Sequence, residues 1–148
     1  MSKRPSTQPP LAAEAFSLPV RVYYEDTDAA GLVYYANYLR FCERARTEWL
    51  RSLAFSQQRL MTDEGIAFVV RSVEARYRAP ARLDDLLAVV SRISRLGGAS
   101  LEFDQKIYRK EELIFDARIT IACIDIAGQR PAPLPPALRI RLLPSAQS

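Results

Sequence analysis

Residues 20–53 read VRVYYEDTDAAGLVYYANYLRFCERARTEWLRSL, a stretch in which the side-chain pattern changes twice. Val20 to Tyr24 alternates as a strand does, and the Asp- and Gly-containing segment 25–31 favours turns. From Tyr38 to Leu53 apolar residues recur at helical spacing, with most charged residues between them. The stretch therefore predicts a strand, a loop and an amphipathic helix of about four turns, with Asn37 as the helix N-cap.

After Gly65 the pattern is typical of strands. Residues 67–77, 86–96, 99–108 and 113–126 predict four long strands. Gly97-Gly98 predicts a hairpin turn, and residues 109–112 predict a second one. One long helix followed by a run of antiparallel strands predicts the α+β class rather than α/β. We expect the helix to lie across a curved sheet, with a remaining edge or face used for self-association.

Length and composition fit one globular domain. The chain has 148 residues, of which 49% are hydrophobic and 26% charged, and single domains commonly run to about 100–150 residues. We expect a flexible N-terminal tail over residues 1–17, one domain over residues 18–143 and a C-terminal tail over residues 144–148. No apolar run approaches the roughly 18 residues that cross a bilayer, and residues 1–15 lack a signal-peptide core, so we expect a cytoplasmic protein.

The residue types present exclude several chemistries. The chain has no histidine, which excludes Ser-His-Asp and Cys-His catalysis and the usual zinc sites. Cys42 and Cys123 lie in apolar stretches, where reduced and buried thiols are expected. The net charge is +4 and the basic residues are scattered, a pattern that does not favour a nucleic-acid partner. We therefore expect no metal and no cofactor, and catalysis by carboxylates, hydroxyls, thiols, amines or backbone dipoles.

Glu25, Asp26 and Asp28 place three carboxylates within four positions, shortly before the predicted helix. Aspartates at such a junction commonly form turns or cap helices. A helix-loop-helix calcium site is excluded, because its fifth and twelfth positions would be Ala30 and Asn37. An aspartyl-phosphatase loop is excluded because it requires a parallel α/β sheet.

A carboxylate beside the start of a helix suits acyl transfer. Backbone N–H groups of the first helical turn are unpaired, and they stabilise negative charge that develops on a carbonyl oxygen. A thioester needs little further help, because its leaving thiol has a pKa of about 8.5. Asp28 can attack the carbonyl as a nucleophile or take a proton from water as a general base. The sequence leaves both roles open.

Residues 23–50, YYEDTDAAGLVYYANYLRFCERARTEWL, resemble the signature of the 4-hydroxybenzoyl-CoA thioesterase family of hotdog-fold proteins. FSQQRLM at residues 55–61 and AFVVRSVEARYRAPARLDDLL at residues 67–87 are similar to its tol-pal-associated acyl-CoA thioesterase subgroup. The resemblance covers roughly residues 20–136. It implies a hotdog fold, in which an antiparallel sheet wraps a long central helix. It also implies sites at the interface of paired subunits, in a dimer or in a homotetramer made of two dimers.

The resemblance extends to individual site residues. The family's catalytic aspartate falls on Asp28, and the amide that polarises the thioester carbonyl falls on the backbone N–H of Tyr35. Gly31 and Ser100 fall on substrate-binding positions. Many members of the subgroup have a histidine in place of Tyr35, and a basic coenzyme A-binding run in place of the Gly-Gly-Ala at residues 97–99. Phosphate contacts then fall to other arginines, and the candidates are Arg76, Arg78, Arg82 and Arg95.

Hydrolysis of acyl-CoA or acyl-carrier-protein thioesters is the function that these residues and the resemblance favour. The alternative is a non-catalytic acyl-thioester-binding or scaffold protein associated with the Tol-Pal envelope system, because the family's histidine and basic run are missing. A dehydratase is disfavoured, since hotdog dehydratases usually employ a histidine. The expected partners are a thioester substrate and further copies of the same chain.

Overall fold

The computed structural model describes residues 15–147, with side chains up to residue 142. Residues 1–14 of the expected N-terminal tail lie outside the described residues, as does Ser148. Strand β1 (Ala15–Arg21) begins three residues before the expected domain start at residue 18. Residues 15–17, expected as part of the N-terminal tail, belong to this strand.

The structure has the long helix and the four later strands where the sequence places them, but its first strand, predicted over residues 20–24, is Ala15–Arg21. It also contains two helices and a short strand that the patterns do not predict. After β1 come a 3-10 turn η1 (Tyr24–Asp26), α2 (Asn37–Ser52), α3 (Gln57–Glu64), β2 (Ile66–Tyr77), β3 (Leu86–Leu96), β4 (Ser100–Arg109), β5 (Glu112–Asp125), β6 (Arg130–Pro131) and α4 (Pro136–Gln147). The α+β class is confirmed.

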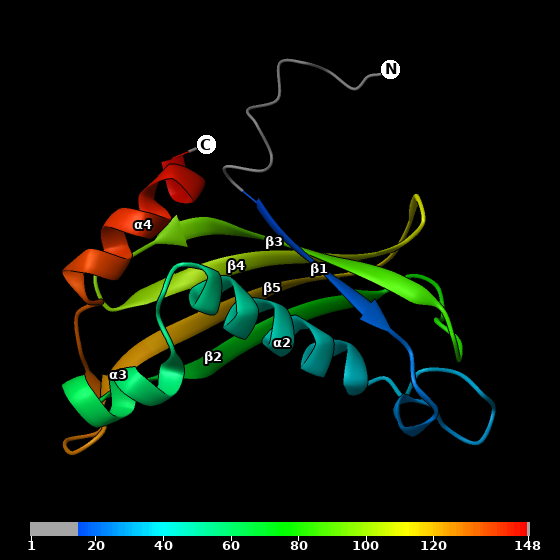
Figure 1. Cartoon of the computed structure of the whole chain (residues 1–148), viewed down its shortest axis with the longest axis horizontal. Helices are drawn as coiled ribbons and strands as arrows, with labels where there is room; N and C mark the ends of the chain where they lie inside the picture. The colour runs from blue at the N-terminus through cyan, green and yellow to red at the C-terminus, as the bar shows by residue number, and fades with distance from the viewer. Residues whose placement is uncertain (1–14, 148) are drawn as a thin grey trace.

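The strands form one six-stranded antiparallel sheet in the order β1-β3-β4-β5-β2, with the short β6 pairing at the end of β5. Figure 1 shows the sheet curving around α2, which lies across its concave face. The Gly97-Gly98 hairpin joins β3 to β4 as predicted. β2 is an edge strand, and its register shifts between Val70 and Ser72. Arg71 sits at this bulge, on a free edge of the sheet.

Side chains alternate between a buried and a wet face along β4. Leu101, Phe103 and Ile107 are buried on the side of α2, whereas Ser100 and Glu102 alternate with them on the outer side. This alternation confirms a sheet with one face covered by the helix. The other surface of the core comes from one face of α2, whose buried residues are Asn37, Tyr38, Phe41, Cys42, Ala45, Trp49 and Leu50.

Both cysteines are buried and form no disulfide, as expected. Burial raises the pKa of the Cys42 thiol to about 12, although the charge of Arg46 acts in the opposite direction. The thiol therefore stays protonated at neutral pH and is a poor nucleophile. Cys42 belongs to the core, and catalysis is left to other groups.

The two unpredicted helices have local boundary signals but weak periodic patterns. The Ser56 side chain accepts a hydrogen bond from the Arg59 N–H and caps α3, which ends at Gly65 in the left-handed conformation, at φ +67°. α4 begins at Pro136, where a missing N–H costs nothing in the first turn. Residues 144–147, expected as a tail, belong to this helix. None of the helices in the described part of the chain is long and apolar enough to cross a membrane.

Candidate active site

Asp28 lies in a tight loop between η1 and α2. Its backbone N–H donates to the Leu32 carbonyl at 2.8 Å, and its carbonyl accepts from Gly31 N at 3.0 Å. Gly31 has φ +81°, a left-handed conformation that glycine adopts without strain. Asp28 Oδ1 accepts from Ala30 N at 2.9 Å and from Leu32 N at 3.2 Å. In the described residues no hydrogen bond reaches Oδ2 of this exposed carboxylate, so one oxygen shapes the loop and the other faces solvent.

Asp26 is buried and bonds within the protein. Its side chain is 4% exposed and accepts from Tyr23 N at 2.9 Å and from Asn37 Nδ2 at 3.0 Å. Its carbonyl accepts from Tyr34 N at 3.0 Å. The two aspartates thus differ in their surroundings, and the 3-10 turn that ends at Asp26 separates them. Asp26 ties the loop to the first residue of α2, while Asp28 remains at the surface.

The first turn of α2 has no side-chain cap. The predicted N-cap role of Asn37 is wrong: Ala36 occupies the N-cap position, and Asn37 is the first helical residue. The Asn37 amide is drawn inward because it pairs with the buried Asp26 carboxylate. The Tyr35 N–H, just before the helix, donates to no acceptor among residues 15–142. An uncapped helix start leaves N–H groups available to a ligand.

The Tyr35 peptide is held by an aromatic neighbour. The hydroxyl of Tyr77, the last residue of β2, donates to the Tyr35 carbonyl at 3.2 Å. The rings of Tyr35 and Tyr77 meet edge to face at 6.4 Å, and Tyr38 contacts Tyr77 in the same way at 5.5 Å. The Tyr35 side chain itself is 62% exposed. The backbone of Tyr35 is therefore oriented, while its ring lies at the surface.

The segment that follows β2 packs against the candidate site. Val33 N donates to the Ala81 carbonyl at 2.9 Å, and Ala81 N donates to the Tyr38 hydroxyl at 3.0 Å. Leu32 forms an isolated antiparallel bridge with Arg82. Residues 81–82 thus contact both the Asp28 loop and the first turn of α2.

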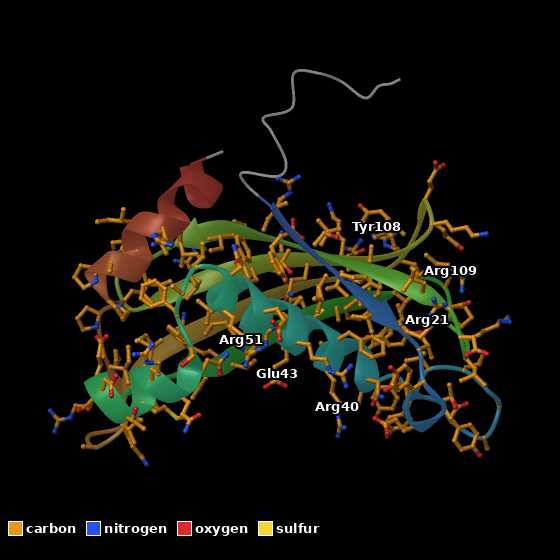
Figure 2. All side chains as sticks on the ribbon, viewed as in Figure 1. Arg21, Arg40, Glu43, Arg51, Tyr108 and Arg109 are labelled. Carbon is orange, nitrogen blue, oxygen red and sulfur yellow. The ribbon has the colours of Figure 1, made fainter. Side chains whose placement is uncertain are left out.

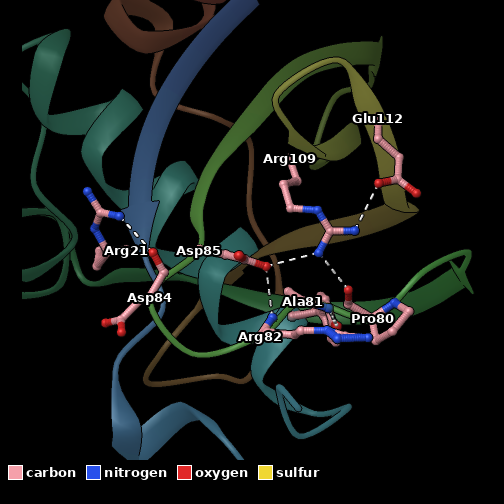
Figure 3. Close-up of polar contacts among 9 residues, drawn as sticks. Arg21, Pro80, Ala81, Arg82, Asp84, Asp85, Arg109 and Glu112 are labelled. Carbon is pink, nitrogen blue, oxygen red and sulfur yellow. Dashed lines mark hydrogen bonds and ion pairs between the residues drawn. The ribbon is translucent and has the colours of Figure 1, made fainter. Parts of the chain in front are cut away.

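Arg109, at the end of β4, anchors this supporting segment (Figure 3). Its guanidinium donates to the Pro80 carbonyl at 2.8 Å, to Asp85 at 2.9 Å and to Glu112 at 2.8 Å. Asp85 Oδ2 also accepts from Arg82 N at 2.9 Å. Burial alone would raise the pKa of Asp85, but the Arg82 N–H and the Arg109 guanidinium hold that pKa below its ordinary value. Sequence reasoning missed this cluster, because its members come from two segments, residues 80–85 and 109–112, that are distant in the sequence.

Ser100 lies far from the other predicted site residues within one chain. It is the first residue of β4, next to the Gly97-Gly98 hairpin, whereas the loop that holds Asp28 is at the opposite end of the molecule (Figure 1). Asp28, Gly31 and Tyr35 come together in one loop. Of the candidate phosphate-binding arginines, Arg78 forms an ion pair with Asp116 on the outer face of the sheet. Within one chain Ser100 and the Asp28 loop are not brought together.

An apolar cavity of about 70 Å³ lies between α2 and the sheet. Its walls come from α2, α3, α4 and strands β2, β4 and β5, and its polar lining residues are Glu43, Arg46 and Gln57. Figure 2 shows Arg40, Glu43 and Arg51 following one another along α2. None of Asp28, Gly31 and Tyr35 lines this cavity. The Asp28 loop and the apolar cavity are therefore separate within a single chain.

A model of the thioesterase-like superfamily matches residues 22–142. The chain belongs to this superfamily. The family resemblance of the sequence is thereby confirmed, and the enzyme class is that of a thioester hydrolase.

Individual members of the thioesterase-like superfamily are close to this chain. It is 51% identical over 121 residues to the acyl-CoA thioester hydrolase YbgC of Escherichia coli O6:H1, covering 81% of this chain and 90% of the relative. It is 48% identical over 120 residues to the acyl-CoA thioesterase YbgC of Haemophilus influenzae, covering 81% and 88%. A solved probable thioesterase from Bartonella henselae superimposes with a TM-score of 0.78 at 40% identity, covering 82% and 99%. The hotdog fold is confirmed.

Proposed function

We propose that this superfamily member hydrolyses acyl-CoA or acyl-carrier-protein thioesters, with Asp28 as the reactive carboxylate. The observation that carries the proposal is the placement of Asp28. One carboxylate oxygen is fixed by two backbone N–H groups and the other is exposed, in a loop that leads into an uncapped helix start. The relatives' names, acyl-CoA thioester hydrolase and acyl-CoA thioesterase, support the substrate class.

The Tyr35 N–H is the proposed donor to the thioester carbonyl oxygen. Together with the positive end of α2 it would stabilise the oxyanion that forms as the carbonyl is attacked. Loss of one such donor typically costs about 3–4 kcal/mol of transition-state stabilisation. Because the donor is a backbone group, the exchange of the family's histidine for Tyr35 leaves it in place. The exposed Tyr35 ring has no assigned chemical step.

Two reaction routes fit Asp28. As a nucleophile, the free carboxylate oxygen forms an anhydride with the acyl group, the thiolate leaves, and water then cleaves the anhydride. As a general base, Asp28 takes a proton from water while that water attacks the carbonyl. Either route needs little help for the leaving group, whose pKa is about 8.5. Neither route needs a histidine.

The complete site is proposed to form between two copies of the chain. β2 leaves one edge of the sheet unpaired, and Val69, Val70 and Val73 on it are 39%, 52% and 40% exposed. A two-fold axis perpendicular to the sheet would pair β2 antiparallel with its own copy, with both long helices on the same face of the joined sheet. The Tyr77 end of one β2 then lies beside the Ile66 end of the other. This arrangement would bring the Asp28 loop of one chain to the apolar cavity of its partner.

Replacement of Asp28 by Asn tests the proposal. Asparagine keeps a carbonyl oxygen for the Ala30 and Leu32 N–H groups, so the loop should persist while the reactive oxygen is lost. We expect kcat for acyl-CoA hydrolysis to fall about a thousandfold or more, with an unchanged melting temperature. Glu25→Gln is the matched control, because Glu25 is an exposed carboxylate in the adjacent turn. Undiminished turnover in Asp28→Asn would refute the assignment.

Isotope labelling separates the two routes. A single turnover in H₂¹⁸O, with enzyme in excess over acyl-CoA, leaves ¹⁸O in the Asp28 carboxylate only if water cleaves an anhydride at the aspartyl carbonyl. A general base leaves Asp28 unlabelled and places the label in the released acid. If water attacks the aspartyl carbonyl of the anhydride, mass spectrometry of the Asp28 peptide distinguishes the two routes. If water attacks the acyl carbonyl instead, Asp28 stays unlabelled, and the anhydride is recognised by trapping it with hydroxylamine.

A binding or scaffold role in the Tol-Pal system is the second candidate. It is favoured by the Gly97-Gly98 hairpin, which carries no basic side chains in place of the family's coenzyme A-binding run. This candidate predicts that acyl-CoA binds without thiol release. Thiol release from a panel of short, long and aromatic acyl-CoA thioesters decides between the two functions. The cytoplasmic location stays a prediction from the sequence.

A further inference from the structure

The C-terminal helix α4 is fastened to two other elements by arginine side chains. Arg139 Nη2 donates to the Gly97 carbonyl and, at 3.3 Å, to the Gly98 carbonyl in the β3–β4 hairpin. Arg141 Nη1 donates to the Leu53 carbonyl, just after α2, at 3.1 Å. Donors at the carbonyl end of a helix are favourably placed with respect to its dipole. α4 therefore has a defined position across one end of the molecule.

Two leucines of α4 form part of the wall of the apolar cavity. Leu138 is 1% exposed and Leu142 is 3% exposed, and both line the cavity. Ile140, on the same helix, is 67% exposed and does not line it. The cavity is thus closed on this side by the one face of α4 that the protein buries.

The exposure of the lining residues shows which side of the cavity is open to solvent and which is closed. Val70 on the edge strand β2 is 52% exposed, and Glu43 on α2 is also exposed, so these residues mark its open side. Leu101 of β4 is 3% exposed and lies inside. The sheet order β2, β5, β4 and β3 means that a chain entering at β2 crosses β5 and β4. It then meets α4, which packs against β3.

We propose that α4 sets the maximum acyl-chain length of this enzyme, with Leu138 and Leu142 as the end wall of the acyl pocket. The inference rests on the proposed thioesterase function, in which the acyl group occupies this cavity. Protein interiors are closely packed, so an additional methylene group at the end of the pocket requires displacement of a leucine. The two arginine anchors oppose such a displacement by holding the helix backbone.

Substitutions of Leu142 in opposite directions test the proposal. For each variant, kcat/KM is measured with straight-chain acyl-CoA thioesters of increasing length, and the limit is the length beyond which kcat/KM falls about tenfold, the smallest effect expected of one methylene group. Leu142→Ala should move the limit about one to two methylene groups longer, because it enlarges the end of the pocket. Leu142→Phe should move it shorter. Ile140→Ala, on the exposed side of α4, should leave the limit unchanged.

Binding measurements keep the test decisive if a variant or the natural protein lacks turnover. Non-hydrolysable S-alkyl thioether analogues of coenzyme A of the same lengths are titrated by calorimetry, and circular dichroism verifies folding. Opposite shifts of the length limit in the two Leu142 variants support the end wall. An unchanged limit in a folded Leu142 variant overturns it, whether or not hydrolysis occurs. Absence of hydrolysis with a clear length limit in binding would reject the proposed function and retain the end wall.

Discussion

Asp26 and Asp28 show how the local backbone assigns different roles to identical side chains. Asp26 is buried against the start of α2 and accepts two hydrogen bonds, whereas Asp28 is exposed and has one oxygen outside the internal hydrogen bonds of the described chain. Their spacing does not explain this division, since residues two apart in extended backbone point to the same side; the 3-10 turn η1, which ends at Asp26, changes the chain direction between them. The identity of the partner of Asp26, Asn37, is a tertiary fact, because the two are eleven positions apart.

A double-mutant cycle measures the Asp26–Asn37 contact. Asp26→Ala leaves the buried Asn37 amide and the Tyr23 N–H without an acceptor, so we expect the free energy of unfolding to fall by about 2–3 kcal/mol. Asn37→Ala should cost less, since Asp26 keeps the Tyr23 N–H. The two effects should be non-additive by about 1 kcal/mol or more. Urea denaturation of both single variants and the double variant provides the values, and full additivity would show that the contact contributes nothing.

At the scale of elements, the site depends on how the segment after β2 is held. Arg109 joins the end of β4 to the Pro80 carbonyl and to Asp85, and residues 81–82 in turn contact the Asp28 loop and Tyr38. The helices α3 and α4 belong to the same scale. Their sequences are short or weakly periodic and therefore do not predict helices. Contacts with the rest of the chain stabilise them. Leu138 and Leu142 of α4 are buried only because this helix packs against the sheet, at strand β3.

The lowered pKa of Asp85 predicts a pH-dependent contribution to stability. A carboxyl group whose pKa is lower in the folded than in the unfolded state stabilises the fold above its unfolded pKa, about 3.9. That contribution is lost as the pH falls through the lower folded pKa. Asp85→Asn should therefore reduce the free energy of unfolding at pH 7, and the difference from the natural protein should be smaller at a pH well below the unfolded pKa of about 3.9. Denaturant titrations at both pH values test this, and an equal difference at both would exclude the charge of Asp85 as the cause.

At the scale of the whole molecule, the free edge of β2 is the surface that a partner is expected to cover. It carries unpaired backbone groups and exposed valines, a combination that soluble proteins rarely leave open. The Asp28 loop and the apolar cavity are separate within one chain, so the proposed function also requires a partner chain that brings them together. A site assembled from two chains needs both of them, so dimer formation and activity should be lost together.

Val73→Lys tests this dependence. Val73 is 40% exposed on β2, and a two-fold axis through the paired strands would bring two introduced lysines close to each other. We expect the dimer dissociation constant to rise about a hundredfold, and hydrolysis to fall in parallel as the protein is diluted. Ile140→Lys is the control, because it places the same charge at an exposed apolar position on α4. Analytical ultracentrifugation measures the assembly, and a fully active Val73→Lys monomer would refute the two-chain site.

The amino-acid sequence by itself determined the features that depend on neighbours within a few residues. These include the alternation of β4, the face of α2, the Gly97-Gly98 hairpin and the tight loop around Asp28 and Gly31. Backbone sterics and side-chain periodicity specify such features locally. Tertiary structure alone decided the burial of Asp26 against Asn37, the Arg109 cluster, the distance of Ser100 from Asp28 and the closure of the cavity by α4. Each of these depends on residues that are distant in the chain and that meet only when the sheet has curved around the helix.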